Sequence, residues 1–270
     1  MESAMTSMEQ GRRKYDAIAD HYEEIFFYVA DGGRWLVDYA DPAPGTRMLD
    51  VGAGRGAVAR AGLARGCLVI AVDASSRMVE RLGEDFPDIV AWQMDAGRLD
   101  FADGSFDLVT AGFLVEVLED PAMAIAEFRR VLVPGGMLAL SLERQSVGGL
   151  QWLHDLHADF FAASLAATAS QGSTGDSAPL SADQLDGMLA DAGLLELTRK
   201  SVTMPKSLSD PQALWDWLAI QGLAEAVAVL PRERAAEFRT RFFAGAEHMH
   251  ATGGIVPEFA ATLHRARVPG

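Results

Sequence analysis

The stretch "MLDVGAGRGAVA", from Met48 to Ala59, decides the fold, because an apolar run ends in an acid that is followed by closely spaced glycines. Such a run predicts a strand that turns tightly into a helix and brings backbone close to a ligand. Two nucleotide-loop patterns share it. The dinucleotide fingerprint G-x-G-x-x-G/A is matched by Gly52, Gly54 and Ala57. The pattern D-x-G-x-G-x-G, which belongs to a loop with different chemistry, is matched by Asp50, Gly52, Gly54 and Gly56. The glycines alone leave both interpretations open.

The sequence around this stretch alternates between strands and helices. This rhythm predicts right-handed βαβ crossovers and a parallel sheet with helices on both faces. We therefore predict an α/β, Rossmann-like fold with a seven-stranded, mostly parallel sheet and additional helical insertions. The expected strands are residues 46–51, 67–73, 89–95, 106–112, 137–143, 194–204 and 257–268. The expected helices are residues 14–29, 34–39, 56–66, 75–86, 122–132, 149–167, 182–193 and a helical stretch over 210–250. Asp120 is the expected N-cap before the helix over 122–132, and Ser181 with Gln184 is an expected capping box for the helix over 182–193.

The changes of rhythm along the chain predict its organisation. We expect a mobile N-terminus over residues 1–13 and a single domain over residues 14–270. Within the domain we expect N-terminal lid helices, a nucleotide-binding core and two substrate-cap insertions, at residues 14–40, 45–143, about 144–180 and 206–252. The polar, Gly- and Ser-rich loop over residues 170–179 follows a helix of the cap, and we hypothesise that it is a gate.

The composition argues against several classes of partner. The formal net charge of −15 disfavours nucleic acid and anionic membranes, which both bind through Lys and Arg. The single cysteine, Cys67, cannot form an internal disulfide, and its apolar surroundings predict a buried, inert thiol. The N-terminus has no signal-peptide apolar region, and no apolar run is long enough to span a bilayer. We expect a soluble, cytoplasmic protein with a small-molecule partner, either monomeric or homodimeric.

Acidic residues extend the loop pattern along the edge of the predicted sheet. Asp73 ends the second expected strand, about 20 residues after the glycines, where a carboxylate can bind ribose hydroxyls. Asp95 ends the third expected strand. Asp95 and Asp50 both fall outside the dinucleotide fingerprint, so the surroundings favour the second pattern.

Five stretches in order resemble the class I S-adenosylmethionine-dependent methyltransferases, and in particular their ubiquinone/menaquinone-type small-molecule subgroup. They are "YDAIADHYEEIF", "LDVGAGRGAVA", "VDASSRM", "MDAGRLDFADGSFDLV" and "DPAMAIAEFRRVLVPGGMLAL", which fall between Tyr15 and Leu142. The resemblance implies S-adenosylmethionine as the cofactor. It also implies a cofactor site made of Tyr22, Asp50, Gly52, Gly54, Asp73, Ala74, Met78, Asp95, Ala96, Phe113 and Leu114.

The resemblance implies a role for each acid of that site. Asp50 would lie beside the cofactor's ammonium, Asp73 would accept from both ribose hydroxyls, and Asp95 would accept from the exocyclic amine of adenine. Structural roles are the alternatives: the aspartates as caps of turns, Met78 as core, and Tyr22 as packing of the first helix.

The sequence departs from the family where a catalytic base is expected. Related sequences carry a His pair before a Leu-x-Asp-Pro turn, whereas "FLVEVLEDP" has Glu116 and Val117 there. Glu116 is therefore a candidate base, with a solvated or ion-paired acid as the alternative. His154 and His157 share one face of a predicted helix and are further candidate bases or structural histidines. No further ligands accompany them, so we expect no metal.

The region after Glu143 is rich in large apolar side chains, which predicts a hydrophobic acceptor. The expected activity is methyl transfer to a hydrophobic small molecule in secondary, isoprenoid or polyketide biosynthesis. Oxygen is the expected acceptor atom, with carbon or nitrogen as alternatives. Two other functions stay open: a protein of this fold that binds the cofactor without transferring methyl, and an NAD(P)-dependent reductase.

Overall fold

The computed structural model describes residues 7–144, 150–170 and 180–270, which form two compact units. The described residues of Met1–Arg144, Pro179–Val202 and Ala261–Gly270 make up the first, here called the core unit. Those of Gln145–Ala178 and Thr203–Ala260 make up the second, the helical unit. The two insertions expected within a single domain, 144–180 and 206–252, thus supply most of a separate compact unit.

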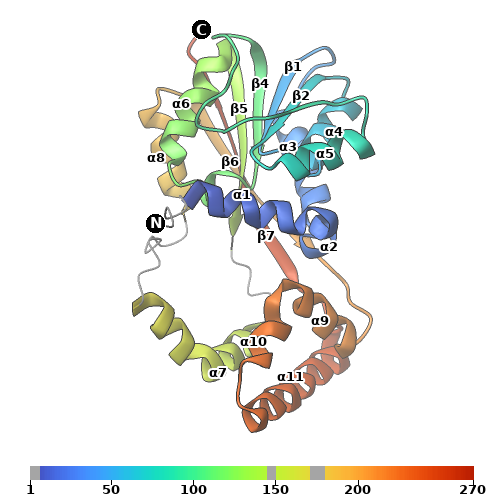
Figure 1. Cartoon of the computed structure of the whole chain (residues 1–270). Helices are drawn as coiled ribbons and strands as arrows, with labels where there is room; N and C mark the ends of the chain where they lie inside the picture. The colour runs from blue at the N-terminus through green and yellow to red at the C-terminus, as the bar shows by residue number, and fades with distance from the viewer. Residues whose placement is uncertain (1–6, 145–149, 171–179) are drawn as a thin grey trace. The chain divides into compact units, whose positions relative to one another are not determined.

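A seven-stranded sheet organises the core unit, with the strand order β3-β2-β1-β4-β5-β7-β6 (Figure 1). Parallel pairing joins β1 to β2 and β4, β2 to β3, and β4 to β5. The predicted α/β, seven-stranded, mostly parallel architecture is confirmed. The strands are β1 (Arg47–Val51), β2 (Leu68–Asp73), β3 (Val90–Gln93), β4 (Phe106–Gly112), β5 (Leu132–Arg144), β6 (Leu195–Pro205) and β7 (Glu258–Arg267).

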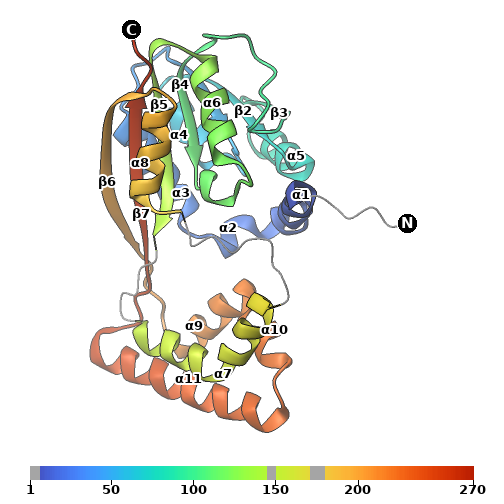
Figure 2. The same ribbon diagram turned by 90° about the vertical axis from the view of Figure 1, so that its left-hand side faces the viewer.

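Helices cover both faces of this sheet (Figures 1 and 2). On one face lie α3 (Val29–Ala40), α4 (Ala57–Ala64) and α5 (Ser76–Asp85), which bury side chains such as Leu36 and Leu82. On the other face lie α6 (Pro121–Val131) and α8 (Ala182–Asp191), which bury Phe128 and Leu185 among others. Each face therefore has its own apolar core, and the layers hold the carboxyl ends of the parallel strands in place.

Two predicted helix starts are confirmed in detail. The Asp120 carboxylate accepts from the Met123 backbone N–H at 2.9 Å at the start of α6. At the start of α8, Ser181 and Gln184 form the expected capping box. Side chains of this kind satisfy N–H groups that the first helical turn leaves free.

The N-terminal segment differs from its prediction. A helix was expected over 14–29, after a mobile stretch that ended at residue 13. Instead α1 (Ser7–Ile18) begins earlier, and a 3₁₀ turn (Ala19–His21) connects it to α2 (Tyr22–Ile25). The helix then breaks at Phe26, whose φ of −107° and ψ of 68° are not helical. The aromatic rings of residues 26–28 pack against one another and their neighbours at this break, and that packing overrides the helical periodicity.

The helical unit is built around aromatic side chains. Its helices are α7 (Gln151–Ser170), α9 (Pro211–Leu218), α10 (Ala224–Ala228) and α11 (Arg232–Gly253), with a π-helical turn (Ala219–Leu223) between α9 and α10. Their buried side chains include Phe160, Phe161, Trp215, Phe238 and Phe242. The hypothesised gate at 170–179 lies almost entirely outside the described residues.

Within 7–144, 150–170 and 180–270, no group of three or more His, Cys, Asp or Glu side chains is arranged to hold a metal ion. Over the same ranges, no helix is both long and apolar enough to cross a membrane.

Candidate functional site

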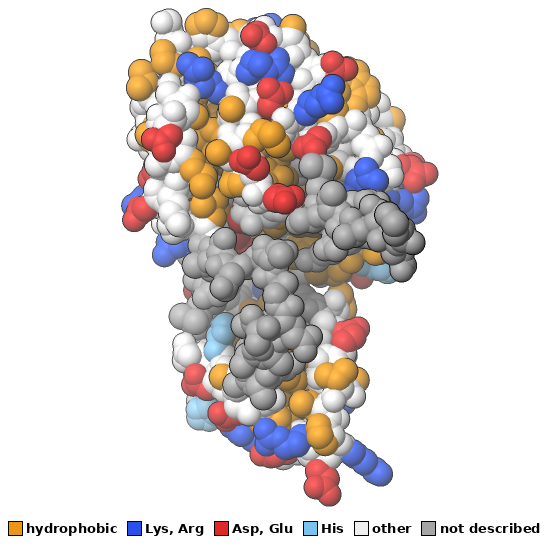
Figure 3. Space-filling view, turned by 60° about the vertical axis from the view of Figure 1, so that its left-hand side comes forward, with side chains coloured by type: hydrophobic (Ala, Val, Ile, Leu, Met, Phe, Trp, Pro, Cys, Tyr) orange, Lys and Arg blue, Asp and Glu red, His pale blue; other side chains and the backbone are white. Residues whose placement is uncertain are grey.

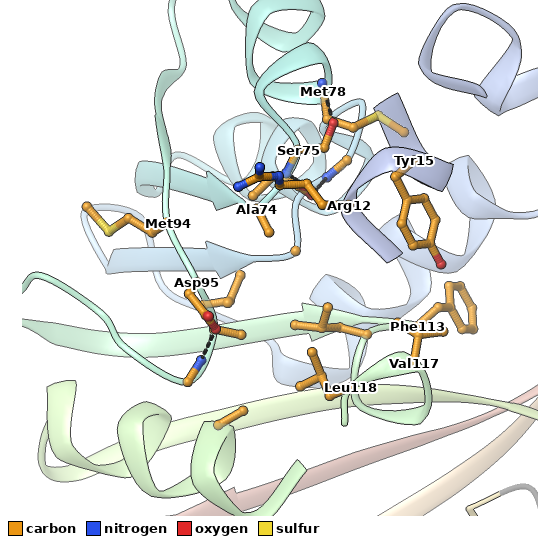
Figure 4. A pocket seen from close by; sticks show the side chains of 18 of the residues that line it. Arg12, Tyr15, Ala74, Ser75, Met78, Met94, Asp95, Phe113, Val117 and Leu118 are labelled. Atoms are coloured by element: carbon orange, nitrogen blue, oxygen red, sulfur yellow. Dashed lines mark hydrogen bonds between the residues drawn. The ribbon is translucent and has the colours of Figure 1, made fainter. Parts of the chain in front are cut away.

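A cavity of about 520 Å³ lies at the carboxyl edge of β1, β2 and β4, entirely within the core unit (Figure 4). Its walls come from α1 and α2 and from the loops that follow β1, β2, β3 and β4. Of the expected cofactor residues, all but one line it: Tyr22, Gly52, Gly54, Asp73, Ala74, Met78, Asp95, Ala96, Phe113 and Leu114. The fold thus brings together residues that are spread over about 90 positions of sequence.

The glycine loop after β1 follows a backbone path that favours glycine. Gly52 and Gly54 have φ of 67° and 53°, which L side chains rarely adopt. A Cβ on Gly52 would lie 2.6 Å from a methyl carbon of Leu114. A Cβ on Gly54 would lie 3.6 Å from the ring of Tyr22, another cavity residue. The loop therefore presents bare backbone to the cavity.

Asp73 connects this loop to the turn after β2. One carboxylate oxygen accepts from the Gly54 N–H and the other from the Ser75 N–H, each at 2.8 Å. Burial raises the pKa of Asp73, while these two N–H donors oppose the rise. A carboxylate has about four acceptor positions, so Asp73 can still accept bonds from a ligand's hydroxyls.

The far end of the cavity combines an acid, Asp95, with apolar side chains. Figure 4 shows Met94 and Asp95 there, with Ala74 between them and Ser75. One oxygen of Asp95 accepts from the Gly97 N–H at 2.8 Å, which holds the side chain at the rim. Met78 is 1% exposed and also lines the cavity, so it is both core and ligand wall. This end suits a flat heterocycle with an exocyclic donor.

Asp50 is the expected cofactor residue that does not line the cavity. Its side chain is 1% exposed, and it accepts from the Thr110 hydroxyl at 2.9 Å, the residue beside it on β4. Its second oxygen has no hydrogen-bond partner among the described residues. Burial raises the pKa of Asp50 to about 7. The placement of Asp50 beside the cofactor's ammonium stays a prediction, since its carboxylate does not line the cavity.

Aromatic rings close the other end of the cavity. Tyr15, Phe113 and Val117 gather there in Figure 4. Phe113 has a positive φ of 54°, and its N–H donates to the Oγ of Ser141 at 3.0 Å. The Phe113 ring packs edge-on against Tyr28, with centroids 5.4 Å apart. A strained backbone held by a buried partner is typical of functional sites.

Glu116 lies beside this end but not on the cavity wall. One carboxylate oxygen accepts from the Glu143 N–H at 3.1 Å, and the other is buried with no hydrogen-bond partner in the described chain. Burial, opposed by backbone hydrogen bonds and assisted by the charge of Glu143, raises the pKa of Glu116 to about 7. The Tyr28 hydroxyl donates to Glu143 at 3.4 Å. A carboxylate with this pKa can take up a proton at neutral pH.

The two histidine candidates are in the helical unit. His154 is exposed on α7, and the ring of His157 packs on Phe161 with centroids 4.6 Å apart. Burial lowers the pKa of His157. Both histidines belong to the helical unit, whereas the residues that line the cavity belong to the core unit.

Several cavity residues were missed by sequence reasoning. Arg12, Tyr15 and Ser75 line the cavity, and Ser141 supports its wall. Tyr15 shares the helical spacing of Tyr22, and this spacing was the available signal. For Ser75 and Ser141 no local pattern points to the role, because it arises from contacts between distant segments.

Comparisons with known proteins agree with this geometry. A family model described as a methyltransferase domain matches residues 49–140. The demethylmenaquinone methyltransferase of Renibacterium salmoninarum is 36% identical over 132 residues, which cover 47% of this chain and 56% of the relative. That of Paenarthrobacter aurescens is 29% identical over 204 residues, or 70% of this chain and 80% of the relative. The nocamycin O-methyltransferase of Saccharothrix syringae is 33% identical over 139 residues, or 47% and 49%. The chain therefore spans about half the length of several curated relatives that it matches.

A solved structure shares the fold over the whole chain. The [4+2]-cyclase SpnF superimposes with a TM-score of 0.63 and 20% identity, covering 100% of this chain and 98% of the cyclase. At this identity the likeness concerns the fold alone.

The loop, the acids at the sheet edge and these matches agree on one class: residues 49–140 match a methyltransferase domain, and the chain is similar to class I S-adenosylmethionine-dependent methyltransferases. Its relatives within that class include methyltransferases of the ubiquinone/menaquinone type. The cofactor is S-adenosylmethionine, so the interpretation of the glycines as a dinucleotide loop was wrong. The residues fit this group, because one cavity is lined by bare glycine backbone, by an acid with unused acceptor positions and by apolar side chains.

Proposed function

We propose that this chain transfers a methyl group from S-adenosylmethionine to a hydrophobic small molecule of the quinone or polyketide kind, with oxygen as the acceptor atom. One observation carries the proposal. The cavity has a polar, acid-bearing end suited to the nucleoside and, about Phe113 and Val117, an aromatic and apolar end suited to such an acceptor. The relatives include demethylmenaquinone methyltransferases and an O-methyltransferase, and their names support an acceptor of the quinone or polyketide kind.

The residues of the chain would bind and orient rather than react. When bound, S-adenosylmethionine supplies a methyl group on a positively charged sulfur. Asp73 would accept from the ribose hydroxyls, and Asp95 from the amine of the adenine. The carboxylates of Asp73, Asp95, Glu119 and Asp120 give the cavity a negative field that favours a cationic ligand. Tyr15, Tyr22 and Phe113 would exclude water and align the acceptor, which is the main requirement of a displacement on an activated carbon.

Glu116 is the proposed proton acceptor when the nucleophile is a hydroxyl. Its pKa of about 7 suits this role, and its neighbours Val117 and Leu118 line the cavity. His154 and His157 stay proposals of lower rank, since they lie in the other unit. Carbon and nitrogen acceptors remain alternatives: a weakly acidic carbon would also need a base, whereas a neutral amine would not.

The face drawn in Figure 3 shows no segregated basic surface among the described residues. On the face drawn in Figure 3, basic and acidic side chains are interspersed over the described residues rather than segregated by sign. A nucleic-acid partner would need a continuous basic surface to displace counterions, so it is not part of the proposal.

Product analysis by mass tests the proposal and separates it from its rival. The protein is incubated with S-adenosylmethionine and a panel of demethylated quinones and phenolic polyketides, with Asp73→Ala as the control. We expect an acceptor to gain one methylene unit in mass, with stoichiometric S-adenosylhomocysteine, and no product from the control. An acceptor that is converted without a change in mass would instead show that the fold binds the cofactor without transferring methyl.

A further inference from the structure

Asp16, on helix α1, reaches the turn that follows β2. One of its carboxylate oxygens accepts from the Ser75 hydroxyl at 2.5 Å and lies 3.3 Å from the Arg77 N–H, which also donates to it. Ser75 is 1% exposed and caps α5, so this contact is made at a buried helix start. A carboxylate at this position is also favoured by the dipole of α5.

Ser75 connects Asp16 to Asp73, the acid proposed to bind the ribose of the cofactor. Its N–H donates to Asp73 at 2.8 Å, while its Oγ accepts from the Met78 N–H at 3.0 Å. A hydroxyl has a single hydrogen to donate, and Asp16 takes it. The direction of that hydroxyl is therefore set by Asp16, and a continuous chain of hydrogen bonds runs from Asp16 through Ser75 and Asp73 to Gly54.

The two segments that these hydrogen bonds connect both line the cavity. Tyr15, the residue before Asp16, lines the cavity from α1, and Ser75 and Met78 line it from the turn and from α5. Figure 4 shows the three side chains around one side of the cavity. The helix that covers the cavity and the turn that would hold the ribose are thus joined by the part-buried hydrogen bond between Asp16 and Ser75.

Asp20 provides a natural contrast on the same segment. Its carboxylate pairs with the side chains of Arg77 and Arg81, each at 3.0 Å, and it is 50% exposed. Exposed ion pairs contribute little to stability. Asp20 thus attaches the segment to α5 without touching the turn, whereas Asp16 attaches it through the turn.

From this geometry we infer that Asp16 is a positioning residue for the cofactor: it holds the Asp73–Ser75 turn in its ribose-binding form and couples that turn to closure by α1. The inference rests on the proposed function only in taking S-adenosylmethionine and its product as ligands. Because coupling between two sites is reciprocal, a cofactor that stabilises the turn also stabilises α1 over the cavity.

Dissociation of S-adenosylhomocysteine from the full chain, followed by stopped flow, tests this role. We expect Asp16→Ala to raise the dissociation rate constant about tenfold or more, since a part-buried hydrogen bond to a charged group is lost. Asp20→Ala, the matched control, should change it less than about threefold. Asp16→Asn keeps an acceptor oxygen without the charge and should fall between them. In a Ser75→Ala background, Asp16→Ala should add less than about twofold, because the shared contact is already absent.

Two further readouts separate positioning from general attachment. For Asp16→Ala the KM for S-adenosylmethionine should rise about tenfold while kcat stays within about twofold. The melting temperatures of the ligand-free Asp16→Ala and Asp20→Ala proteins report on folding. Equal dissociation rates for these two variants, with binding by the wild type intact, would overturn the inference and leave the proposed function standing. A wild-type chain that does not bind S-adenosylhomocysteine would overturn both.

Discussion

The core unit and the helical unit bury different kinds of side chain. In the described chain, the buried polar or charged residues all lie in the core unit: Asp50, Ser75, Thr110, Ser141, Thr262 and His264. The buried residues of the helical unit are apolar, and aromatic rings dominate among them. Burying a polar group costs free energy unless it is hydrogen-bonded. In the core unit, Ser75 and Ser141 avoid this cost through hydrogen bonds that support the cavity, whereas the interior of the helical unit is held by apolar packing.

The largest expected effect tests whether the two units are energetically separate. Phe242 is fully buried in the helical unit, with its ring 5.1 Å from that of Trp215. Phe242→Ala should destabilise that unit by about 3–5 kcal/mol. Binding of S-adenosylhomocysteine, measured by calorimetry, should change less than about twofold because the cavity lies in the core unit.

The matched substitution for this test is Phe128→Ala, which removes an equally buried ring from the core unit. It should lower both the stability and the cofactor affinity. If Phe242→Ala weakened binding as strongly as Phe128→Ala, the separation of the two units would be wrong.

The next effect concerns the polar edge of the core unit. Asp73→Ala removes the acceptor of two backbone N–H groups and of the proposed ribose bonds. Each hydrogen bond to a charged group contributes about 1.5–3 kcal/mol, so affinity for S-adenosylmethionine should fall about 100-fold or more. Asp107→Ala breaks an exposed ion pair with Arg47 on the same sheet and should leave calorimetric binding unchanged. Comparable losses in the two variants would contradict the assignment of the ribose to Asp73.

The raised pKa of Glu116 predicts how the stability of the core unit depends on pH. Its pKa is raised from 4.5 to about 7 by burial, so the folded state holds a proton that the unfolded state releases. The unfolding free energy should therefore decrease between about pH 4.5 and pH 7 and then level off. Glu116→Gln should remove part of this decrease. The substitution should therefore raise the unfolding free energy by about 1–3 kcal/mol more at pH 8 than it does at pH 5.

Denaturant titrations of both proteins at pH 5 and pH 8 measure this difference. Asp50, whose pKa is also about 7, contributes a decrease in the same window that should persist in the variant. An unchanged pH dependence in Glu116→Gln would show that Glu116 is ionised in the folded protein at pH 5.

The smallest effects compare one kind of helix cap in the two units. Ser181 caps α8 in the core unit, and Asp210 caps α9 in the helical unit by accepting from the Ala213 N–H at 2.9 Å. Ser181→Ala and Asp210→Ala should each cost about 1 kcal/mol of stability in thermal melting. Neither should change cofactor affinity, and a change with Asp210→Ala alone would indicate that the helical unit contributes to the cofactor site.

Local signals made most of the fold predictable. The bounds of β4, Phe106–Gly112, were predicted to the residue, and the caps at Asp120 and Ser181 were read from spacing alone. The glycine loop was also predictable, because its backbone has positive φ at every second residue, Gly52, Gly54 and Gly56, and positive φ favours glycine.

Features that depend on distant contacts were not predictable. Asp50 has the place of a cofactor residue in the loop pattern, but its carboxylate accepts a hydrogen bond from Thr110, 60 residues away, and does not line the cavity. Asp16 showed no signal, because its partner Ser75 lies 59 residues on. The helix break at Phe26 depends on ring packing with Tyr22 and Tyr28, which periodicity does not encode.

The strand order β5-β7-β6 has a consequence for biosynthesis. Of the seven strands, β7 is translated last, yet its place is between two strands that leave the ribosome before it. A nascent chain that has not passed Arg267 therefore carries unpaired edges on both β5 and β6, and such edges can pair with other chains. We expect the nascent protein to need protection from aggregation until this final strand is inserted.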